Sequence, residues 1–264
     1  MLIDAHTHLD GYMGLGAAAL DKALAEIDLH KIFTISNSMD VPSYGRNVEI
    51  AARCPFVLPA FGIHPWNAHK YADRPEELSA FLDQSPLYGE IGLDHYFVKI
   101  KSRYPAQKQI FEFFLGAARD QDKIVIVHTK GAEAEALEIL GSYAPVRVVV
   151  HWYSGPLDIF RQMIESGFYF TVGGEVRRSE KIRAIAREIP ADRLLTETDN
   201  PGGPRSYTRR PGSPADLLEI IRSLAVARGT TPDELVLTIK TNITDLIGND
   251  GRLAGWLERM QSAK

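Results

Sequence analysis

The amino-acid sequence predicts an α/β protein, a (β/α)8 TIM barrel with a C-terminal helical extension. Short apolar runs rich in Ile, Val and Phe recur between stretches of helical periodicity along the 264 residues. Continuous apolar runs of this kind suit parallel strands that are covered on both faces. Eight strand-helix units in about 250 residues match the usual size of the barrel fold. No Ser/Gly-rich linker or charge block divides the sequence, so we expect residues 1–264 to form one domain.

The predicted strands, in chain order, are Leu2 to Ala5, Lys31 to Ser36, Phe56 to Phe61, Tyr88 to Ile91, Ile124 to Val127, Arg147 to Val150, Phe168 to Val172 and Arg193 to Glu197. Between them, helical periodicity marks crossovers at Ala17 to Leu29, Ala106 to Ala118 and Lys181 to Glu188. An open doubly wound sheet is the alternative fold. It needs a glycine-rich phosphate turn after the first strand, and His6-Thr7-His8-Leu9-Asp10 is not one.

Two helix starts near the C-terminus have local signatures. Ser213 followed by Pro214 indicates an N-cap with proline at the first helical position, and Thr231-Pro232-Asp233-Glu234 is typical of a capping box. These signatures predict a final pair of helices at Ala215 to Ala227 and Asp233 to Leu246.

The composition limits the partners and the compartment. A net charge of −4 argues against a broad basic surface, so an anionic substrate must be bound by a local positive feature such as a metal ion. The single cysteine, Cys54, excludes an internal disulfide framework and fits a reducing compartment. The N-terminus has no basic leader, and no apolar run reaches the roughly 20 residues of a membrane span. We therefore expect a cytoplasmic protein without a membrane partner; the oligomeric state is open.

Six potential metal ligands follow the predicted strands. Every one of them falls at the C-terminal end of a strand, where barrels place their active sites; they are His6, His8, Glu90, His128, His151 and Asp199. His6 and His8 are two residues apart, so strand alternation points both side chains the same way. Carboxylates inside apolar runs are costly unless they are paired or bind metal. A metal site is therefore the leading interpretation, and a purely structural polar cluster is the alternative.

The ligand types limit the choice of ion. Imidazoles and carboxylates suit Zn or Mn, whereas Mg prefers mostly oxygen. Six ligands are too many for one tetrahedral ion, so we expect two divalent ions. With two carboxylates and a bridging hydroxide, the pocket keeps a net charge of about +1, which suits a phosphodiester.

At this point the sequence resembles the TatD-type metal-dependent hydrolases, many of them deoxyribonucleases, within the amidohydrolase superfamily. The resemblance runs from Ile3 to about Leu246. Its motifs are Asp4-Ala5-His6-Thr7-His8, Gly62-Ile63-His64-Pro65, Gly89-Glu90-Ile91-Gly92-Leu93-Asp94, His128-Thr129-Lys130, His151-Trp152-Tyr153-Ser154-Gly155 and Glu197-Thr198-Asp199-Asn200-Pro201.

The resemblance implies a division of the ligands between two ions. The first ion takes His6, His8 and Asp199, the second takes His128 and His151, and Glu90 bridges them. Many relatives that cut amides and lactones bridge their metals with a carboxylated lysine, and no lysine lies between Tyr88 and Asp94. Metal contact lowers the pKa of a bridging water towards neutrality. Asp199 is then the expected general base, so Asp199 and Glu90 are the expected catalytic residues.

Three residues are predicted to bind substrate. His64 follows the third strand, although a hydrogen-bonded loop histidine is an alternative. Lys130 stands where the family often has arginine, which keeps the charge but not a bidentate phosphate contact. Arg205 lies in the loop after the eighth strand, where barrels often bind phosphate, although a solvated loop is the alternative.

Other residues near the predicted site have weaker signals. Arg209 and Arg210 share the loop of Arg205, and Trp152 and Tyr153 either stack on a base or wall the pocket. Trp66 stands where the family often has a second histidine after the His-Pro pair.

The sequence is compatible with three functions. The leading one is a phosphodiesterase or deoxyribonuclease acting on DNA ends or short nucleotides. The second is a hydrolase that attacks an amide, a lactone or another carbon-centred ester at the same metal pair. The third is a metal-binding protein without turnover.

Overall fold

The computed structural model describes residues 1–262 of the chain. The predicted strands are confirmed, each within two residues of its expected ends. They are β1 (Leu2–Thr7), β2 (Ile32–Asn37), β3 (Val57–Ala60), β4 (Tyr88–Gly92), β5 (Ile124–His128), β6 (Arg147–Val150), β7 (Tyr169–Val172) and β8 (Leu194–Thr196). Almost every strand residue is buried, as expected for parallel strands with both faces covered.

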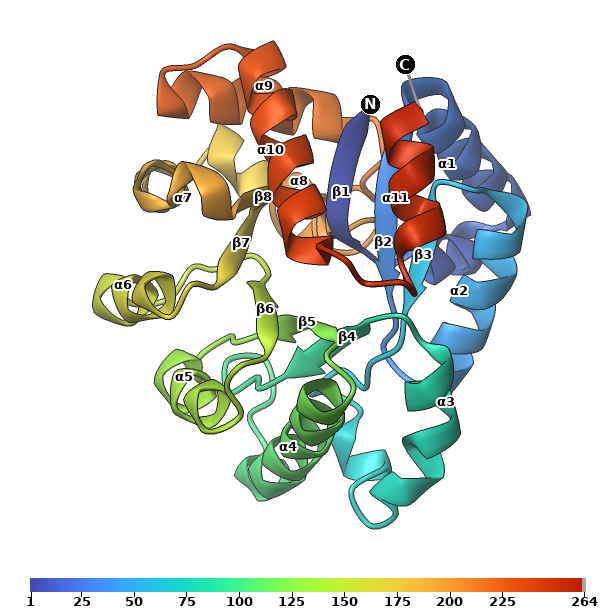
Figure 1. Ribbon diagram of the computed structural model, residues 1–264, viewed down its shortest axis with the longest axis vertical. Coiled ribbons are helices and arrows are strands. Elements are labelled where there is room, and N and C mark those ends of the chain that lie inside the picture. Colours follow the sequence, from blue (N-terminus) through green and yellow to red (C-terminus); the bar gives the residue numbers. More distant parts are fainter. Residues whose placement is uncertain (263–264) are drawn as a thin grey trace.

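All strand pairings are parallel and follow the chain order, which confirms the barrel topology. One ladder runs β1-β2-β3 and a second runs β4-β5-β6-β7-β8. A single bridge between Phe61 and Tyr88 joins the two ladders. At the other seam, backbone hydrogen bonds join β1 to the chain after β8, from Asp199 N to His6 O at 3.0 Å and from His8 N to Asn200 O at 2.7 Å. The strands therefore surround one central core (Figure 1).

Helices form an outer layer around the strands, in the order of the chain (Figure 1). The α-helices are α1 (Ala17–His30), α2 (Val41–Arg53), α3 (Ser79–Gln84), α4 (Tyr104–Asp120), α5 (Glu133–Ser142), α6 (Leu157–Glu165), α7 (Glu180–Glu188), α8 (Arg205–Thr208), α9 (Asp216–Arg228), α10 (Pro232–Ile247) and α11 (Ala254–Ser262). Short 3-10 helices are η1 (Leu9–Leu15), η2 (Ala68–Lys70), η3 (Pro75–Leu78), η4 (Lys101–Arg103), η5 (Gly174–Arg177) and η6 (Ala191–Arg193).

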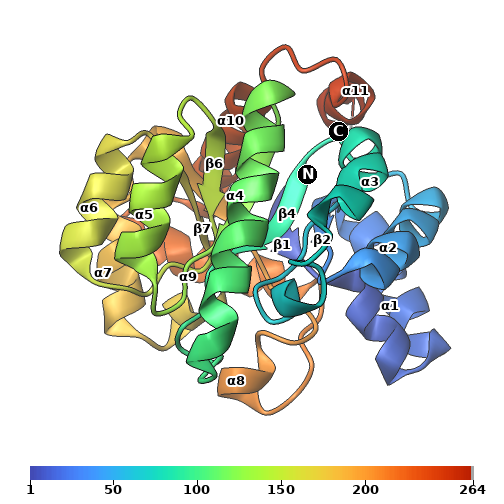
Figure 2. The same ribbon diagram turned by 90° about the horizontal axis from the view of Figure 1, so that it is seen from below.

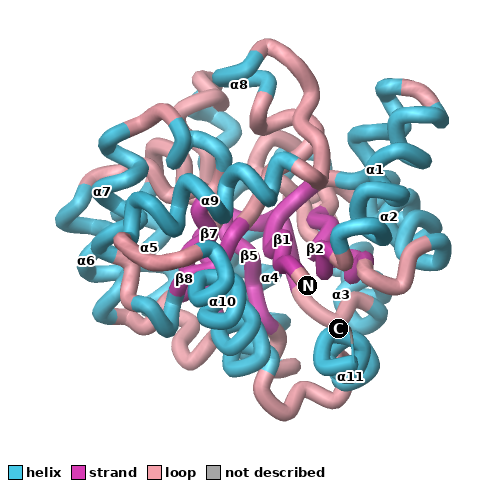
Figure 3. The backbone as a smooth tube through the Cα atoms, turned by 90° about the horizontal axis from the view of Figure 1, so that it is seen from above, coloured by secondary structure: helices cyan, strands magenta, loops and turns pink. Residues whose placement is uncertain are grey.

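The two ends of the barrel differ. The loop with α8 lies at one end, while the N-terminus and α11 lie at the other, and two views agree on this (Figures 2 and 3). Helix α11 covers the N-terminal ends of the strands, where buried Trp256 packs edge-on against Phe33 at 5.4 Å between ring centroids. Beside it, the core leaves an apolar cavity of about 10 Å³. The C-terminal ends of the strands therefore face the loops at the opposite end.

Both predicted C-terminal helices are confirmed within one residue at each end, but only one of their two predicted caps is. The Ser213 hydroxyl donates to Glu26 of α1 and does not cap a helix, and α9 begins three residues later, at Asp216. The Asp216 carboxylate instead accepts from the Ser213 amide at 2.8 Å. At α10, Thr231 and Glu234 form the complete capping box that the sequence predicted. No helix among the described residues has the length and apolar character that a membrane crossing requires. The predicted domain, 1–264, includes two residues that lie outside the described ones.

Candidate metal centre

Glu90 occupies the centre of the site. It lies on β4 and is 1% exposed. Its position depends on two neighbouring glycines, Gly62 and Gly89. A Cβ atom at Gly62 would lie 2.4 Å from the backbone of Gly89, and one at Gly89 would lie 2.1 Å from the side chain of Asn37. Only glycine at both positions allows β2, β3 and β4 to approach this closely. The approach brings the Glu90 carboxylate into the mouth of the barrel.

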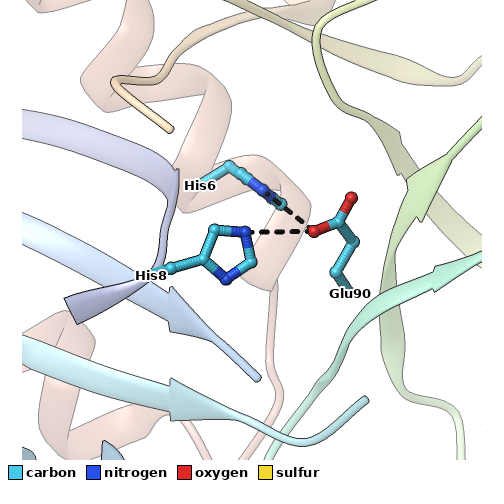
Figure 4. A group of neighbouring side chains, drawn as sticks. All are labelled: His6, His8 and Glu90. Carbon is cyan, nitrogen blue, oxygen red and sulfur yellow. Dashed lines mark ion pairs between the residues drawn. The ribbon is translucent and has the colours of Figure 1, made fainter. Parts of the chain in front are cut away.

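The two oxygens of Glu90 face different groups of histidines. Oε2 lies 3.5 Å from His6 Nε2 and 3.1 Å from His8 Nε2, and Figure 4 shows both rings directed at this oxygen. Oε1 lies 2.7 Å from His128 Nδ1 and 2.8 Å from His151 Nε2. One carboxylate therefore stands between two separate pairs of imidazoles.

Asp199 completes the group around β1. Its Oδ1 lies 3.6 Å from His6 Nε2 and 3.4 Å from His8 Nε2. Both ring nitrogens of His6 are buried without a hydrogen-bond partner, a costly state for polar atoms unless they have another ligand. Four ligands at about 2.0–2.2 Å from a tetrahedral ion stand about 3.3–3.6 Å apart. The spacing of His6, His8, Glu90 and Asp199 is close to this, so these side chains could hold one cation.

The second pair is packed more tightly. His128 Nδ1 lies 3.1 Å from His151 Nε2 and both lie within 2.8 Å of Glu90 Oε1. These separations are hydrogen-bond distances and are shorter than the edges of a tetrahedral metal site. A cation could occupy this position only after the two imidazoles and Glu90 move apart by a few tenths of an ångström.

Hydrogen bonds behind the rings fix which nitrogen faces the pocket. The Nδ1–H of His8 donates to the backbone oxygen of Asn37 at 3.0 Å, which leaves Nε2 with a free lone pair. The Nε2–H of His128 donates to Asp94 at 3.2 Å, which directs Nδ1 into the pocket, 2.7 Å from Glu90 Oε1. Glu197 lies behind His151, with 3.4 Å between Oε2 and Nδ1. Such partners orient metal-binding histidines and raise their basicity.

His64 has the opposite arrangement. Its Nδ1 accepts the backbone N–H of Trp66 at 3.2 Å, so the proton of the neutral ring is on Nε2. Nε2 lies 3.3 Å from Glu90 Oε1, to which it can donate. Burial lowers the pKa of His64 to about 4, which keeps the ring neutral. His64 is therefore a hydrogen-bond donor at the site, although its position beside Glu90 and His128 also satisfies the spacing of a metal ligand.

The carboxylates of the site favour positive charge next to them. Burial alone would lower the pKa of His128, but hydrogen bonds to Asp94 and Glu90 raise it to about 9. Burial would raise the pKa of Glu90, yet the surrounding imidazoles hold it well below its usual range. The pKa of Asp199 is likewise lowered against burial, by the imidazoles of His6 and His8 beside it. A cation that enters the pocket therefore competes with protons on the imidazoles.

The structure thus brings the six predicted ligands together, with His64 beside them. Lys130 also lies at the rim, where its ammonium donates to Ser154 Oγ at 2.6 Å and lies 5.4 Å from the Trp152 ring. Burial lowers the pKa of Lys130. Arg205 is exposed at the start of α8, and among the described residues no hydrogen bond or ion pair joins its guanidinium to the six ligands.

The two aromatic residues after His151 differ in what they can do. The interpretation of Tyr153 as a stacking residue is wrong, because its ring is 4% exposed and its hydroxyl donates to the Pro156 carbonyl oxygen at 2.6 Å. Trp152 is half-buried and donates through Nε1 to Glu175 at 2.8 Å, so it forms part of the pocket wall.

Two buried carboxylates that contact the histidines were not predicted as site residues. Asp94 accepts from His128 Nε2, Trp66 Nε1 and the backbone amides of Tyr96 and Phe97. Burial alone would raise the pKa of Asp94, but these donors, with His128 first, lower it. Glu197 accepts from Thr171 Oγ1 at 2.7 Å behind His151. The signal available in the sequence was position alone, because each acid lies within two residues of the C-terminal end of a strand.

A TIM barrel with histidines and carboxylates gathered at the C-terminal ends of its strands is typical of the metal-dependent hydrolases. Residues 3–248 match the family described as TatD related DNase, so the chain belongs to that family. This confirms the resemblance that the sequence motifs indicated.

Individual relatives agree with this assignment. The chain is 30% identical over 260 residues to the uncharacterized metal-dependent hydrolase YcfH of Escherichia coli K12, covering 94% of this chain and 96% of the relative. It is 30% identical over 213 residues to the 3'-5' ssDNA/RNA exonuclease TatD of Citrobacter koseri, covering 76% and 81% of the two chains. The crystal structure of the E. coli TatD homolog YjjV has a TM-score of 0.82 at 24% identity, covering 93% of this chain and 97% of that chain. This last likeness concerns the fold.

Proposed function

We propose that this metal-dependent hydrolase holds two divalent ions and hydrolyses phosphodiester bonds at DNA ends or in short nucleotides. The observation that carries the proposal is the division of the two Glu90 oxygens between the pair His6 and His8 and the pair His128 and His151. A carboxylate placed between two groups of neutral nitrogen ligands suits a pair of ions, each bound by one oxygen.

The proposed ligands divide as the geometry suggests. His6, His8 and Asp199 would hold one ion and His128 and His151 a second, with Glu90 shared between the two positions. The donor set of imidazoles with carboxylates suits Zn or Mn better than Mg. When bound, such ions lower the pKa of a water molecule and draw charge from a phosphoryl oxygen.

The chain's own residues supply the remaining steps. Asp199 accepts a proton from the attacking water, because its carboxylate is ionised and is the more exposed acid of the pocket. The Nε2–H of His64 can donate to a phosphate oxygen. Lys130 adds positive charge at the rim. A phosphodiester substrate is supported by these donors and by the relative named as an exonuclease.

The metal content tests the site. We expect two ions per chain in protein purified without chelators, and loss of both in a His6→Ala/His8→Ala variant, because both ion positions depend on Glu90 and the ion at His6 and His8 holds that shared carboxylate in place. Elemental analysis measures the stoichiometry, and circular dichroism checks that the variant is folded. A His30→Ala/His69→Ala protein is the matched control, because neither residue lies among the six ligands. One tightly held ion in a tetrahedral site would contradict the two-ion proposal.

The substrate class is tested separately, with protein reloaded with Zn, Mn or Mg. Single-stranded DNA and bis-p-nitrophenyl phosphate are assayed beside amide and lactone substrates. The proposal requires turnover of the phosphodiesters. Turnover of only the amide or lactone would assign the same centre to attack on carbon.

Asp94 offers a test of how the second ion position is held. We expect Asp94→Asn to weaken metal binding at His128 by about 10- to 100-fold, because the amide cannot accept from all the donors that now hold Asp94. Calorimetric titration of the metal-free protein with metal ions measures the affinity of each position. The affinity of the ion held by His6 and His8 should change much less, and equal weakening at both positions would indicate a general loss of structure instead.

We also propose that residues 1–264 form one domain and that the protein works in the cytoplasm. The support for a cytoplasmic location is the single cysteine, Cys54, which is buried and without a disulfide partner.

A further inference from the structure

Exposed aromatic side chains gather at one place on the surface. Trp66 is 44% exposed, Tyr96 57% and Phe97 55%. These three are the only exposed aromatic residues among residues 1–262, and Ile100, at 52% exposed, follows Tyr96 and Phe97 in their loop. Single exposed apolar residues are ordinary, but a contiguous group on an otherwise polar surface marks a binding surface. We call Trp66, Tyr96 and Phe97 the aromatic platform.

The rings of the platform do not stack on one another. Trp66 and Phe97 meet edge to face, with 5.9 Å between ring centroids and 74° between ring planes. Tyr96 and Phe97 meet the same way at 4.8 Å and 89°. Each of the three residues keeps between 44% and 57% of its surface exposed, so aromatic surface remains for a flat ligand.

Buried Asp94 fixes the platform in place. Its Oδ2 accepts from Trp66 Nε1 at 2.6 Å, and its Oδ1 accepts from the amides of Tyr96 and Phe97 at 2.9 and 2.7 Å. The neighbouring amide of His95 donates to the Lys130 carbonyl oxygen at 2.9 Å. A platform anchored in this way loses little conformational entropy when a ligand binds.

The platform is continuous with the candidate metal centre. The Trp66 ring lies edge-on to the His64 ring at 4.8 Å, and His64 Nε2 lies 3.3 Å from Glu90. Asp94, which anchors the platform, also accepts from His128. A ligand group that stacks on Trp66 or Phe97 therefore lies beside the reacting centre.

Cations follow the platform along the chain. The Lys99 ammonium lies 4.8 Å from the Tyr96 ring centroid, and Lys101 and Arg103 come next, on η4. Asp94, the carboxylate that the platform residues contact, is buried and fully used by its donors. Cations close to exposed aromatic rings suit a ligand that carries both flat rings and phosphates.

We propose that the aromatic platform stacks an unpaired base of a single-stranded nucleic acid whose neighbouring phosphodiester lies at the metal centre. This inference rests on the proposed function and makes its substrate class narrower. A base inside a duplex is already stacked and paired, so it can reach the platform only by leaving the helix. Stacking recognises the face that every base has, so the subsite is selective for single strands and tolerant of sequence. A purely apolar partner surface would leave Lys99, Lys101 and Arg103 without a counterpart.

Binding of modified oligonucleotides tests the proposal. A fluorescent eight-nucleotide thymidine strand with phosphorothioate linkages resists cleavage, so its affinity for the metal-loaded protein can be measured by fluorescence anisotropy. Strands in which one nucleotide at a time is replaced by an abasic sugar keep the backbone charge and lose one base. We expect one position at which base removal weakens binding about tenfold, and a comparable loss for the matched duplex.

Protein variants locate that base. The Phe97→Ala and Trp66→Leu proteins should bind the abasic strand and the intact strand with affinities that differ by less than about twofold. The Phe97→Tyr protein keeps the ring and should keep the tenfold difference in affinity. Leu237→Ala, an exposed apolar residue on α10, is the control and should behave as the unchanged protein. Equal affinity for intact and abasic strands in the unchanged protein would overturn the proposal. So would a dimer that is lost in Phe97→Ala while strand binding stays the same.

Hydrolysis of bis-p-nitrophenyl phosphate, which has no base, separates this proposal from the proposed function. Absence of phosphodiester turnover together with base-dependent binding would refute the enzyme function and leave the nucleic-acid platform standing. Turnover without any base-dependent binding would refute the platform alone.

Discussion

A Glu90→Gln protein should lose hydrolysis by about 10³-fold or more and bind fewer than two ions per chain. The change keeps the size of the side chain but replaces the carboxylate with a neutral amide, so His6 and His8 keep Asp199 as a negative ligand while His128 and His151 lose theirs. The remaining pair would have to hold a divalent ion with neutral imidazoles alone, while the amide nitrogen faces them as a donor. Rate measurements at saturating metal and elemental analysis give the two readouts.

The control for this substitution is Glu188→Gln. Glu188 makes a surface ion pair with Arg161, in which Arg161 Nε lies 2.9 Å from the Glu188 carboxylate. We expect this variant to keep its metal and its rate, because surface ion pairs contribute at most about 1 kcal/mol to stability. A Glu90→Gln protein that retained both ions and the full rate would refute the bridging role and the two-ion proposal with it.

The fold and the position of the ligands could be predicted from the sequence because both depend on local patterns. Continuous apolar runs located the strands, and the step from each run to a polar residue marked its C-terminal end. The spacing of His6 and His8 placed both rings on one side of β1, and the structure directs both Nε2 atoms at Glu90 Oε2. The barrel then brings residues from distant strands together without any further information.

The partners behind the ligands could not be predicted, because they depend on how loops and side chains pack. Asp94 is recognisable only when its four donors are in place, and these come from β5 and from two loops. The donor role of His64 depends on the amide of Trp66, which the sequence cannot position. The failed cap at Ser213 has the same cause, since the partner of its hydroxyl is Glu26, far away in the sequence.

The aromatic platform shows the same limit at a larger scale. Trp66 follows β3 and Phe97 follows β4, and Asp94 joins the two loops by accepting from both. In the sequence, Trp66 stood out merely as a departure from the family pattern, and Tyr96 and Phe97 did not stand out at all. Residues that recognise substrate vary with the loops, whereas the ligands stay at the strand ends.

An Asp199→Asn protein should show a kcat lower by about 10²- to 10⁴-fold, the usual contribution of a positioned general base. The Asp199 side chain is 16% exposed, against 2% for Glu90, so it is the carboxylate that meets incoming water. Its pKa lies below the ordinary 3.8, because the imidazoles of His6 and His8 beside it outweigh the effect of burial. The carboxylate is therefore ionised throughout the neutral range, and its protonation should limit the rate only when the pH falls below the ordinary range of an aspartate carboxyl.

The same variant separates a base from a metal ligand, since Asp199 also lies 3.4 Å from His8 Nε2. Asparagine keeps an oxygen that can bind an ion but cannot accept the proton, so a general base predicts a low kcat that excess metal does not restore, with KM changed little. Recovery of the rate at high metal concentration would assign Asp199 to metal binding alone. The control is Asp192→Asn, a surface residue paired with Arg193, which should retain full activity. If the Asp199→Asn protein and the unchanged protein hydrolyse every substrate equally poorly, the chain binds metal without turnover.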